Sequence, residues 1–180
     1  MAHVLLGASA SVAVYKACDL ASKLTQRAHV VRVILTARAA ELVNPQLFEA
    51  VTGQPAHVDE FGAARHAAMD HIELARWGDV LVIAPASADL VGRLANGIAN
   101  DLLTTVSLAL AQNKPRLIAP AMNPVMLLAP AVQRNLRQLR EDGWRVLEPD
   151  EGTMACGDVG PGRLPEPVRI ADVLESMLVR

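Results

Sequence analysis

The chain has 180 residues, a formal net charge of −2 and an apolar fraction of 52%, whereas aromatic residues make up only 3% of it. This length predicts one domain whose core is built from alanine, valine, leucine and isoleucine. The near-neutral charge argues against nucleic acid and anionic membrane surfaces as partners. Two distant cysteines make no disulfide framework, no apolar run approaches the roughly 20 residues of a membrane span, and no signal-peptide pattern opens the chain. We therefore expect a cytoplasmic protein.

Short apolar runs that end in small or polar residues predict the strands of a parallel sheet. The run at residues 79–84 (DVLVIA) is apolar on both faces, as a central parallel strand requires. Residues 53–69 show no clear period and are interpreted as a connection that contains a strand or a turn. Further strands are expected at residues 3–6, 29–35, 116–119 and 144–147. Their alternation with helical patterns predicts a single-domain α/β protein with a Rossmann or flavodoxin-like, three-layer, doubly wound parallel sheet of five or six strands.

Helices are predicted from apolar residues at helical spacing and from capping residues. Cys18 falls on the apolar face of the first helix and is expected to be a small core residue. Gly97 is expected to end one helix, and Asn100 or Asp101 to cap the next. A short segment at residues 70–77 precedes the central strand. The expected helices span residues 12–26, 37–43, 45–51, 130–142 and 167–178, with one running from residues 85–89 to about 96 and another from about 100 to 112.

The segment at residues 151–163 (EGTMACGDVGPGR) contains four glycines, one proline and Cys156. This composition excludes a helix or a central strand and predicts a mobile loop or lid whose backbone can approach a ligand. An ordinary surface loop before the last helix is the alternative. Glycines beside Cys156 imply access, which a reactive thiol needs, and the thiol is interpreted as a proton donor, a nucleophile or an inert loop group.

Small polar residues follow four of the predicted strands, at residues 7–11, 36, 85–89 and 120–123. The carboxyl ends of parallel strands are where ligands bind in doubly wound sheets. Hydroxyl groups and unpaired N–H groups at helix starts form an anion site, and a phosphate-bearing cofactor is its expected occupant. Simple helix capping by Ser11 and Ser87 is the alternative interpretation.

Several common motifs are absent from the sequence. There is no GxGxxG, no GxxxxGK[ST], no GxSxG and no zinc-ligand spacing, which disfavours a standard NAD site, a P-loop, an α/β-hydrolase and a zinc site. His71 is a candidate acid, base or binding group because imidazole titrates near neutral pH, and a solvent-facing side chain is equally compatible with its sequence context.

Four segments match, in order, the motifs of a known family: HIELARW (71–77), PASADL with ANGIANDLLTT (85–90 and 95–105), PAMNPVM (120–126) and ACGDVGPGR (155–163). They resemble the active-site histidine segment, the flavin-binding motif, the substrate-binding motif and the cysteine-bearing flap of the flavin-dependent cysteine decarboxylases. That family includes phosphopantothenoylcysteine decarboxylase and the peptidyl-cysteine decarboxylases of modified-peptide biosynthesis. In three places the chain departs from the family. Leu127 replaces a tryptophan, Asp89 and Leu90 replace asparagine and threonine, and the opening turn reads ASAS instead of a GSGS-like sequence.

The resemblance implies a flavoprotein domain over residues 1–180. It also implies a substrate flap at about residues 150–165, FMN or alternatively FAD as the cofactor, and no metal. His71 would act as a base or positioning group, and Cys156 would supply a proton in the second half-reaction. The implied substrate-binding residues are Arg76, Ala121, Met122, Asn123, Met126 and Arg163, of which Arg163 or Arg76 would contact the substrate phosphate. The implied cofactor-binding residues are Gly7, Ser9, Ser11, Thr36, Pro85, Ala86, Ser87, Ala88, Asp101 and Thr104.

By the same resemblance, flavin oxidation of a cysteinyl thiol lets the neighbouring carboxylate leave as CO₂. The favoured substrate is 4′-phosphopantothenoylcysteine, converted to 4′-phosphopantetheine in coenzyme A biosynthesis, because the chain has the flap cysteine that peptidyl-cysteine decarboxylases typically lack. A peptide that ends in cysteine, converted to an aminoenethiol, is the alternative substrate. A non-catalytic regulatory subunit is a third hypothesis, although the chain shows no acidic tail. The family's assembly implies a homotrimer, or a dodecamer built of trimers, in which His71 acts across the subunit interface.

Overall fold

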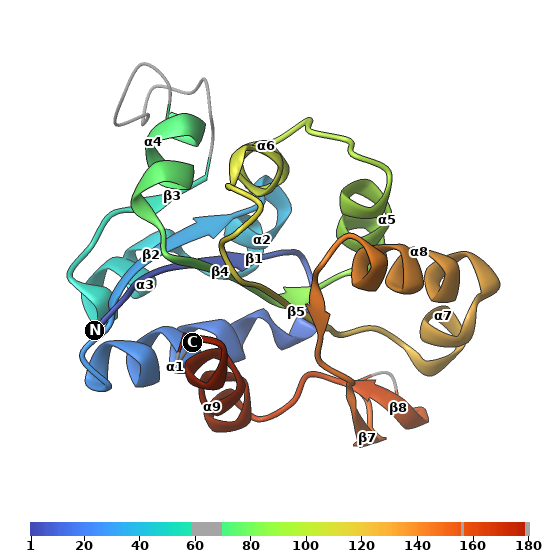
Figure 1. The fold of residues 1–180 in the computed structure, drawn as a ribbon. Coiled ribbons are helices and arrows are strands. Elements are labelled where there is room, and N and C mark those ends of the chain that lie inside the picture. The colour runs from blue at the N-terminus through green and yellow to red at the C-terminus, as the bar shows by residue number, and fades with distance from the viewer. Residues whose placement is uncertain (59–69, 156, 179–180) are drawn as a thin grey trace.

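The computed structural model describes residues 1–58, 70–155 and 157–178. It contains a six-stranded parallel sheet with the order β3-β2-β1-β4-β5-β6, and helices cover both of its faces (Figure 1). The strand order reverses between β1 and β4, and doubly wound sheets bind ligands beyond the carboxyl ends of the strands at such a point. The strands are β1 (His3–Ala8), β2 (Val30–Leu35), β3 (Ala56–His57), β4 (Val80–Ala86), β5 (Arg116–Pro120) and β6 (Arg145–Val146). The prediction of a doubly wound three-layer sheet is confirmed.

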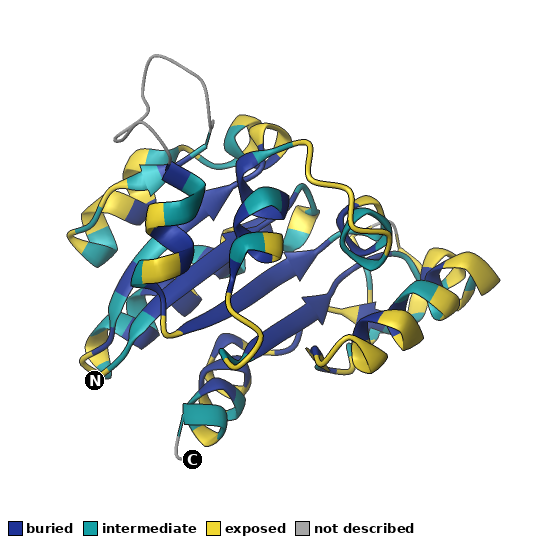
Figure 2. Cartoon of the chain, turned by 45° about the horizontal axis from the view of Figure 1, so that its top comes forward, coloured by how far each residue is buried: buried dark blue, intermediate teal, exposed yellow. Residues whose placement is uncertain are grey.

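Two hydrophobic clusters, one on each face, hold the layers together. Along β1, Val4 and Leu6 belong to one cluster and Leu5 to the other, because successive side chains of a strand point to opposite faces. Figure 2 shows the central strands buried between helices whose outer sides are exposed. The first cluster packs against η1 (Val12–Val14), α1 (Tyr15–Gln26), α2 (Ala37–Leu42), α3 (Pro45–Thr52) and α9 (Pro167–Leu178). The second packs against α4 (Asp70–Trp77), α5 (Ala88–Ala95), α6 (Leu102–Ala109), α7 (Pro124–Leu128) and α8 (Pro130–Glu141).

Helix boundaries near the sheet follow the predicted caps. Ser87 begins α5, and its hydroxyl oxygen accepts a hydrogen bond from a backbone N–H of the first turn. Asp101 begins α6 in a reciprocal capping box with Thr104, so Asp101 rather than Asn100 is the cap. Gly97 follows α5 with a φ of +66°, which a glycine adopts without steric cost. The predicted ends of α5 and the predicted bounds of α9 are therefore confirmed.

The glycine-rich segment forms a β-hairpin instead of a loop. Strands β7 (Asp150–Thr153) and β8 (Val159–Arg163) pair antiparallel to one another and stand apart from the main sheet. The hairpin docks beside the end of β5, where the N–H of Met122 donates to the carbonyl of Gly162 over 3.1 Å. A Cβ at residue 162 would lie 2.1 Å from the Met122 carbonyl oxygen, so this approach requires glycine. The composition predicted a loop because glycine has low strand propensity, and cross-strand hydrogen bonds outweigh that propensity here.

Three further details differ from the sequence-based expectations. Helix α7 was not predicted, because five residues are too short to show a helical period, and it is set instead by the Asn123 cap and by Pro124. Helix α6 ends at Ala109 rather than at about residue 112, because Leu110 is extended. Cys18 is half-buried and packs against the first cluster from its margin. Within the described ranges, no helix is long and apolar enough to cross a membrane.

Candidate active site and cofactor cavity

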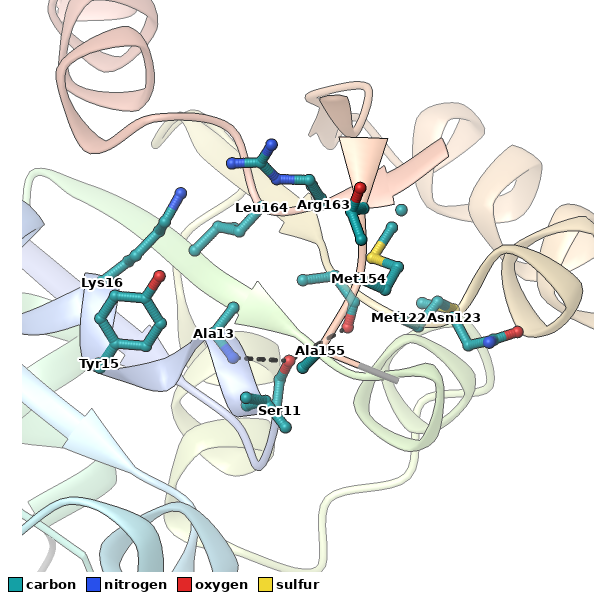
Figure 3. Close-up of a pocket in the computed structure, with 14 residues that line it drawn as sticks. Ser11, Ala13, Tyr15, Lys16, Met122, Asn123, Met154, Ala155, Arg163 and Leu164 are labelled. Carbon is teal, nitrogen blue, oxygen red and sulfur yellow. Dashed lines mark hydrogen bonds between the residues drawn. The ribbon is translucent and has the colours of Figure 1, made fainter. Parts of the chain in front are cut away.

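Two cavities lie at the carboxyl ends of the strands. We call the first the hairpin cavity; it measures about 600 Å³ and lies between the β7–β8 hairpin, the start of α1 and the segment after β5 (Figure 3). We call the second the switch-point cavity; it measures about 410 Å³ and lies beyond β1, β2 and β4. The hairpin cavity is lined by Ser11, Val12, Ala13, Tyr15, Lys16, Ala121, Met122, Asn123, Thr153, Met154, Ala155, Gly162, Arg163 and Leu164. The switch-point cavity is lined by Ser9, Ala10, Thr36, Ala37, Arg38, Ser87, Ala88, Asp89, Arg93, Asn100, Asp101 and Met126.

Ser9 joins the ends of two neighbouring strands beneath the switch-point cavity. Its buried hydroxyl donates to the carbonyl oxygen of Pro85 over 3.0 Å and accepts from the N–H of Ser87 over 2.8 Å. The Ser9 N–H also donates to the Pro85 carbonyl over 3.0 Å. Because the hydroxyl hydrogen already has a protein acceptor, Ser9 fixes the shape of the cavity floor and offers a ligand chiefly its remaining oxygen lone pair.

Thr36 and Ser87 place two hydroxyl groups at helix starts on the wall of the same cavity. Each oxygen accepts from a backbone N–H of its helix, that of Ala39 or of Leu90, in both cases over 3.3 Å. A hydroxyl that accepts in this way keeps its own hydrogen for donation. The capping and the ligand-binding interpretations of these residues are therefore compatible. Together with the positive ends of the two helices, the hydroxyls form a donor set that suits a phosphate group.

Arg93 is a residue of the switch-point cavity that the sequence analysis missed. Its guanidinium donates to the carboxylates of Asp89 and Asp101 over 3.0 and 2.5 Å, and to the side-chain oxygen of Asn100 over 2.8 Å. Burial disfavours the charged form of Asp101, but hydrogen bonds from Arg93 and Thr104 outweigh it and hold the pKa of Asp101 below its usual value. The i,i+4 spacing of Asp89 and Arg93 was the available sequence signal.

Four residues predicted to bind the cofactor line neither cavity. Gly7 is explained by packing, because a Cβ there would lie 2.5 Å from Cδ1 of Leu103 on α6. The buried hydroxyl of Thr104 bonds to Asp101 within the capping box. Pro85, which follows a cis peptide bond, and Ala86 are the last residues of β4. Their predicted contacts to a cofactor stay predictions.

Four of the six predicted substrate-binding residues come together on the hairpin cavity. They are Ala121, Met122, Asn123 and Arg163, and Ser11 joins them there, although it was predicted to bind the cofactor. The Asn123 amide oxygen accepts from the N–H of Val125 over 2.8 Å, and its amide nitrogen donates to the carboxylate of Asp158 in the hairpin. The Asn123 side chain therefore contacts a carboxylate that the hairpin supplies. Met126 lies one turn further along α7 and lines the switch-point cavity instead.

The two remaining predicted residues of the described chain lie on α4, away from both cavities. Figure 1 shows α4 and the hairpin at opposite sides of the molecule. His71 is in the first turn of α4, and Arg76 is exposed in its last turn, which leads to the amino end of β4. Within the described residues of a single chain, His71 and Arg76 therefore lie away from Asn123. Cys156 lies outside the described residues, while its neighbour Ala155 lines the hairpin cavity.

A doubly wound sheet with a phosphate-type donor set at its switch point defines a nucleotide-cofactor-binding α/β protein. The chain matches the Flavoprotein family over residues 1–179 and belongs to that family, and its cofactor is a flavin. This match confirms that the chain is a flavoprotein, as the resemblance implied. Coenzyme A biosynthesis bifunctional protein CoaBC of Bacillus subtilis is 46% identical over 174 residues, which are 97% of this chain but 42% of that relative. The chain thus spans about two fifths of its length.

Solved structures confirm the predicted resemblance to the flavin-dependent cysteine decarboxylases. The fold resembles a cysteine-to-serine variant of PPC decarboxylase in complex with pantothenoylaminoethenethiol, with 34% identity, a TM-score of 0.88 and 99% coverage of both chains. It also resembles SpaF, described as an FMN-dependent cysteine decarboxylase, with 34% identity, a TM-score of 0.82 and coverage of 99% of this chain and 98% of the other.

Proposed function

We propose that the chain is an FMN-dependent carboxy-lyase that decarboxylates 4′-phosphopantothenoylcysteine (PPC) to 4′-phosphopantetheine, a step of coenzyme A biosynthesis. The observation that supports the proposal is that the two cavities adjoin at one helical turn. Asn123 lines the hairpin cavity, and Met126, three positions further on, lines the switch-point cavity. A flavin in the second cavity would therefore lie next to a substrate in the first, as electron transfer between them requires.

The donor set of the switch-point cavity fits a flavin mononucleotide. Thr36 and Ser87 would donate their hydroxyl hydrogens to the phosphate, and the exposed side chain of Arg38 would add a positive charge. FMN is favoured over FAD because SpaF, at 34% identity, is described as FMN-dependent. When bound, the flavin supplies a two-electron acceptor for the substrate thiol and later returns both electrons.

Asn123 would hold the carboxylate that leaves as CO₂. Its amide nitrogen now donates to the carboxylate of Asp158, and a substrate carboxylate would replace that acceptor. An amide is neutral, so it fixes the position of the carboxylate without an ion pair that would resist the loss of its charge. Electrons released with CO₂ would pass into the thioaldehyde made by oxidation of the thiol, which leaves an enethiol.

Cys156 and His71 complete the proposed site. Cys156 would donate a proton to a carbon of the enethiol, as formation of a saturated thiol requires. His71 would reach the thiol from a neighbouring subunit, because α4 lies away from the hairpin of its own chain (Figure 1). We therefore propose a homotrimer, alone or within a dodecamer, whose sites are shared between subunits.

Complementation tests the shared site. Separate His71→Asn and Asn123→Ala variants are each expected to be inactive, whereas co-expression of the two is expected to restore part of the activity, because some mixed sites contain both wild-type groups. No recovery in verified mixed oligomers would exclude a site that is completed in trans.

Product masses test the proposed reaction. FMN-loaded protein is incubated with PPC and, separately, with a peptide that ends in cysteine. We expect PPC to lose CO₂ alone. Loss of CO₂ and two hydrogens from the peptide, with PPC unchanged, would instead favour peptidyl-cysteine decarboxylation. Protein that retains no flavin, even after addition of FMN, would refute both reactions.

A further inference from the structure

One end of the hairpin cavity is cationic. Lys16 on α1 and Arg163 on β8 both line it, and Figure 3 shows their charged groups directed toward the same end. Asn123 lies at the opposite end, Met154 lies between, and Leu164 lies beside the two cations. The cavity therefore has a neutral amide at one end, the apolar Met154 in its middle and two positive charges at the other end.

The two cations share one carboxylate. Nζ of Lys16 donates to Oε1 of Glu166 over 2.8 Å, and Nη2 of Arg163 lies 3.7 Å from the same oxygen. The Lys16 side chain is only 13% exposed, whereas that of Glu166 is 58% exposed. The hydrogen bond from Lys16 and the charge of Arg163 lower the pKa of Glu166, so it carries its full charge at neutral pH. The cluster has a net charge of +1 and an acceptor that can swing into solvent.

The other lysines of the chain have different settings. Lys23 pairs with Asp19 one turn away on the outside of α1, at 3.3 Å. Lys114 donates to the carbonyl oxygens of Ala75 and Arg76, each over 2.9 Å, and so ties a turn to the end of α4. Lys16 differs because its stem is largely buried while its ammonium group faces a cavity.

We propose that Lys16 and Arg163 form a subsite for the terminal phosphate of the substrate, and that Glu166 occupies this subsite until the phosphate displaces it. A phosphate carries up to two negative charges and three acceptor oxygens, so it outcompetes a single carboxylate for an ammonium and a guanidinium group. Solvent at the exposed Glu166 carboxylate weakens its ion pairs, so their replacement by the phosphate costs little free energy. This subsite deepens the proposed function, on which it rests, because it selects a phosphorylated substrate over a neutral peptide.

The layout of the cavity matches the chemistry of such a molecule. A phosphopantothenoyl chain has an anionic phosphate at one end, a largely uncharged middle and a cysteine carboxylate at the other end. Lys16 and Arg163 would hold the first, Met154 would contact the second, and Asn123 would hold the third. A peptide that ends in cysteine presents no dianion to the cationic end.

Paired ligands test the subsite without catalysis. Binding of 4′-phosphopantothenate and of pantothenate, which lack the reactive cysteine, is measured by calorimetry with FMN-loaded protein. We expect Lys16→Met to weaken binding of the phosphorylated ligand about 10- to 100-fold and to change that of pantothenate less than about twofold. Glu166→Gln is expected to tighten the phosphorylated ligand several-fold, because the competing carboxylate is lost. Lys23→Met, on the same helix, is the matched control and is expected to change neither.

Two results would overturn the subsite: equal weakening of both ligands by Lys16→Met, or weaker binding of 4′-phosphopantothenate to Glu166→Gln. Turnover of PPC and of its unphosphorylated analogue distinguishes a failure of the proposed subsite from a failure of the proposed decarboxylation. Wild-type protein that binds 4′-phosphopantothenate through Lys16 but decarboxylates neither compound would refute the proposed function and retain the subsite. Decarboxylation of both compounds with equal kcat/KM, unaffected by Lys16→Met, would retain the reaction and refute the subsite.

Discussion

Replacement of Gly162 by alanine is expected to undock the hairpin from the end of β5. The new Cβ would lie 2.1 Å from the carbonyl oxygen of Met122 and 3.0 Å from Cε of Met154, and the backbone at residue 162 has a φ of +137°. Overpacking costs about 1–3 kcal/mol, and a side chain in a sparsely populated backbone region adds about 1–3 kcal/mol. A total of about 3 kcal/mol corresponds to a roughly 100-fold smaller equilibrium constant for docking of the hairpin.

Because the hairpin stands outside the main sheet, this change is expected to affect catalysis more than folding. We expect kcat/KM for PPC to fall by up to about 100-fold in Gly162→Ala, while the bound flavin and the Tm stay close to wild type. Gly143→Ala is the matched control: its φ is +88°, but no atom lies within 4 Å of a Cβ there, and it lies between α8 and β6, outside the hairpin. It is expected to lose about 1 kcal/mol of stability and no activity. Wild-type kcat/KM in Gly162→Ala would refute hairpin docking as a requirement.

Three further outcomes are expected. Ser9→Ala should lower the free energy of unfolding by about 1–3 kcal/mol in denaturant titrations, since the partly buried N–H of Ser87 loses its acceptor, and an unchanged midpoint would contradict this. Asp101→Asn should cost about 1–2 kcal/mol near neutral pH by weakening the bond to Arg93. The folded-state pKa of Asp101 is depressed, so the stability difference between wild type and Asp101→Asn is fully present above the unfolded-state pKa and is lost as the pH falls through the folded-state pKa. Thermal unfolding at several pH values checks this dependence. Cys156→Ser should release the enethiol, two hydrogens lighter than the wild-type product; a saturated product at the wild-type rate would show that another group donates the proton.

Local sequence signals predicted most of the fold. The caps Ser87 and Asp101 begin the helices that they were expected to begin, and α9 has the predicted bounds, because capping and amphipathic spacing are properties of neighbouring residues. The hairpin was missed because its strands depend on pairing between β7 and β8, which glycine content does not reveal. Helix α7 was missed because it has only five residues.

The candidate site was predictable in its motifs but not in its partners. Polar strand ends indicated where ligands bind, and the four motifs indicated a flavin. Sequence could not show that the hydroxyl of Ser9 is already bonded to Pro85, since the two residues are 76 positions apart. Nor could it show that Lys16 meets Glu166, 150 positions away, at one end of a cavity. Both contacts depend on tertiary packing that brings distant segments of the chain side by side.

The central claim is that one flavin first accepts and then returns the electrons of a single substrate, so that the net reaction needs no external oxidant. Anaerobic incubation of FMN-loaded protein with excess PPC tests this directly, with CO₂ and the visible flavin spectrum recorded together. We predict many equivalents of CO₂ per flavin, with an oxidised spectrum once the substrate is exhausted. Release of a single equivalent followed by lasting bleaching of the flavin, or no CO₂ at all, would contradict the account.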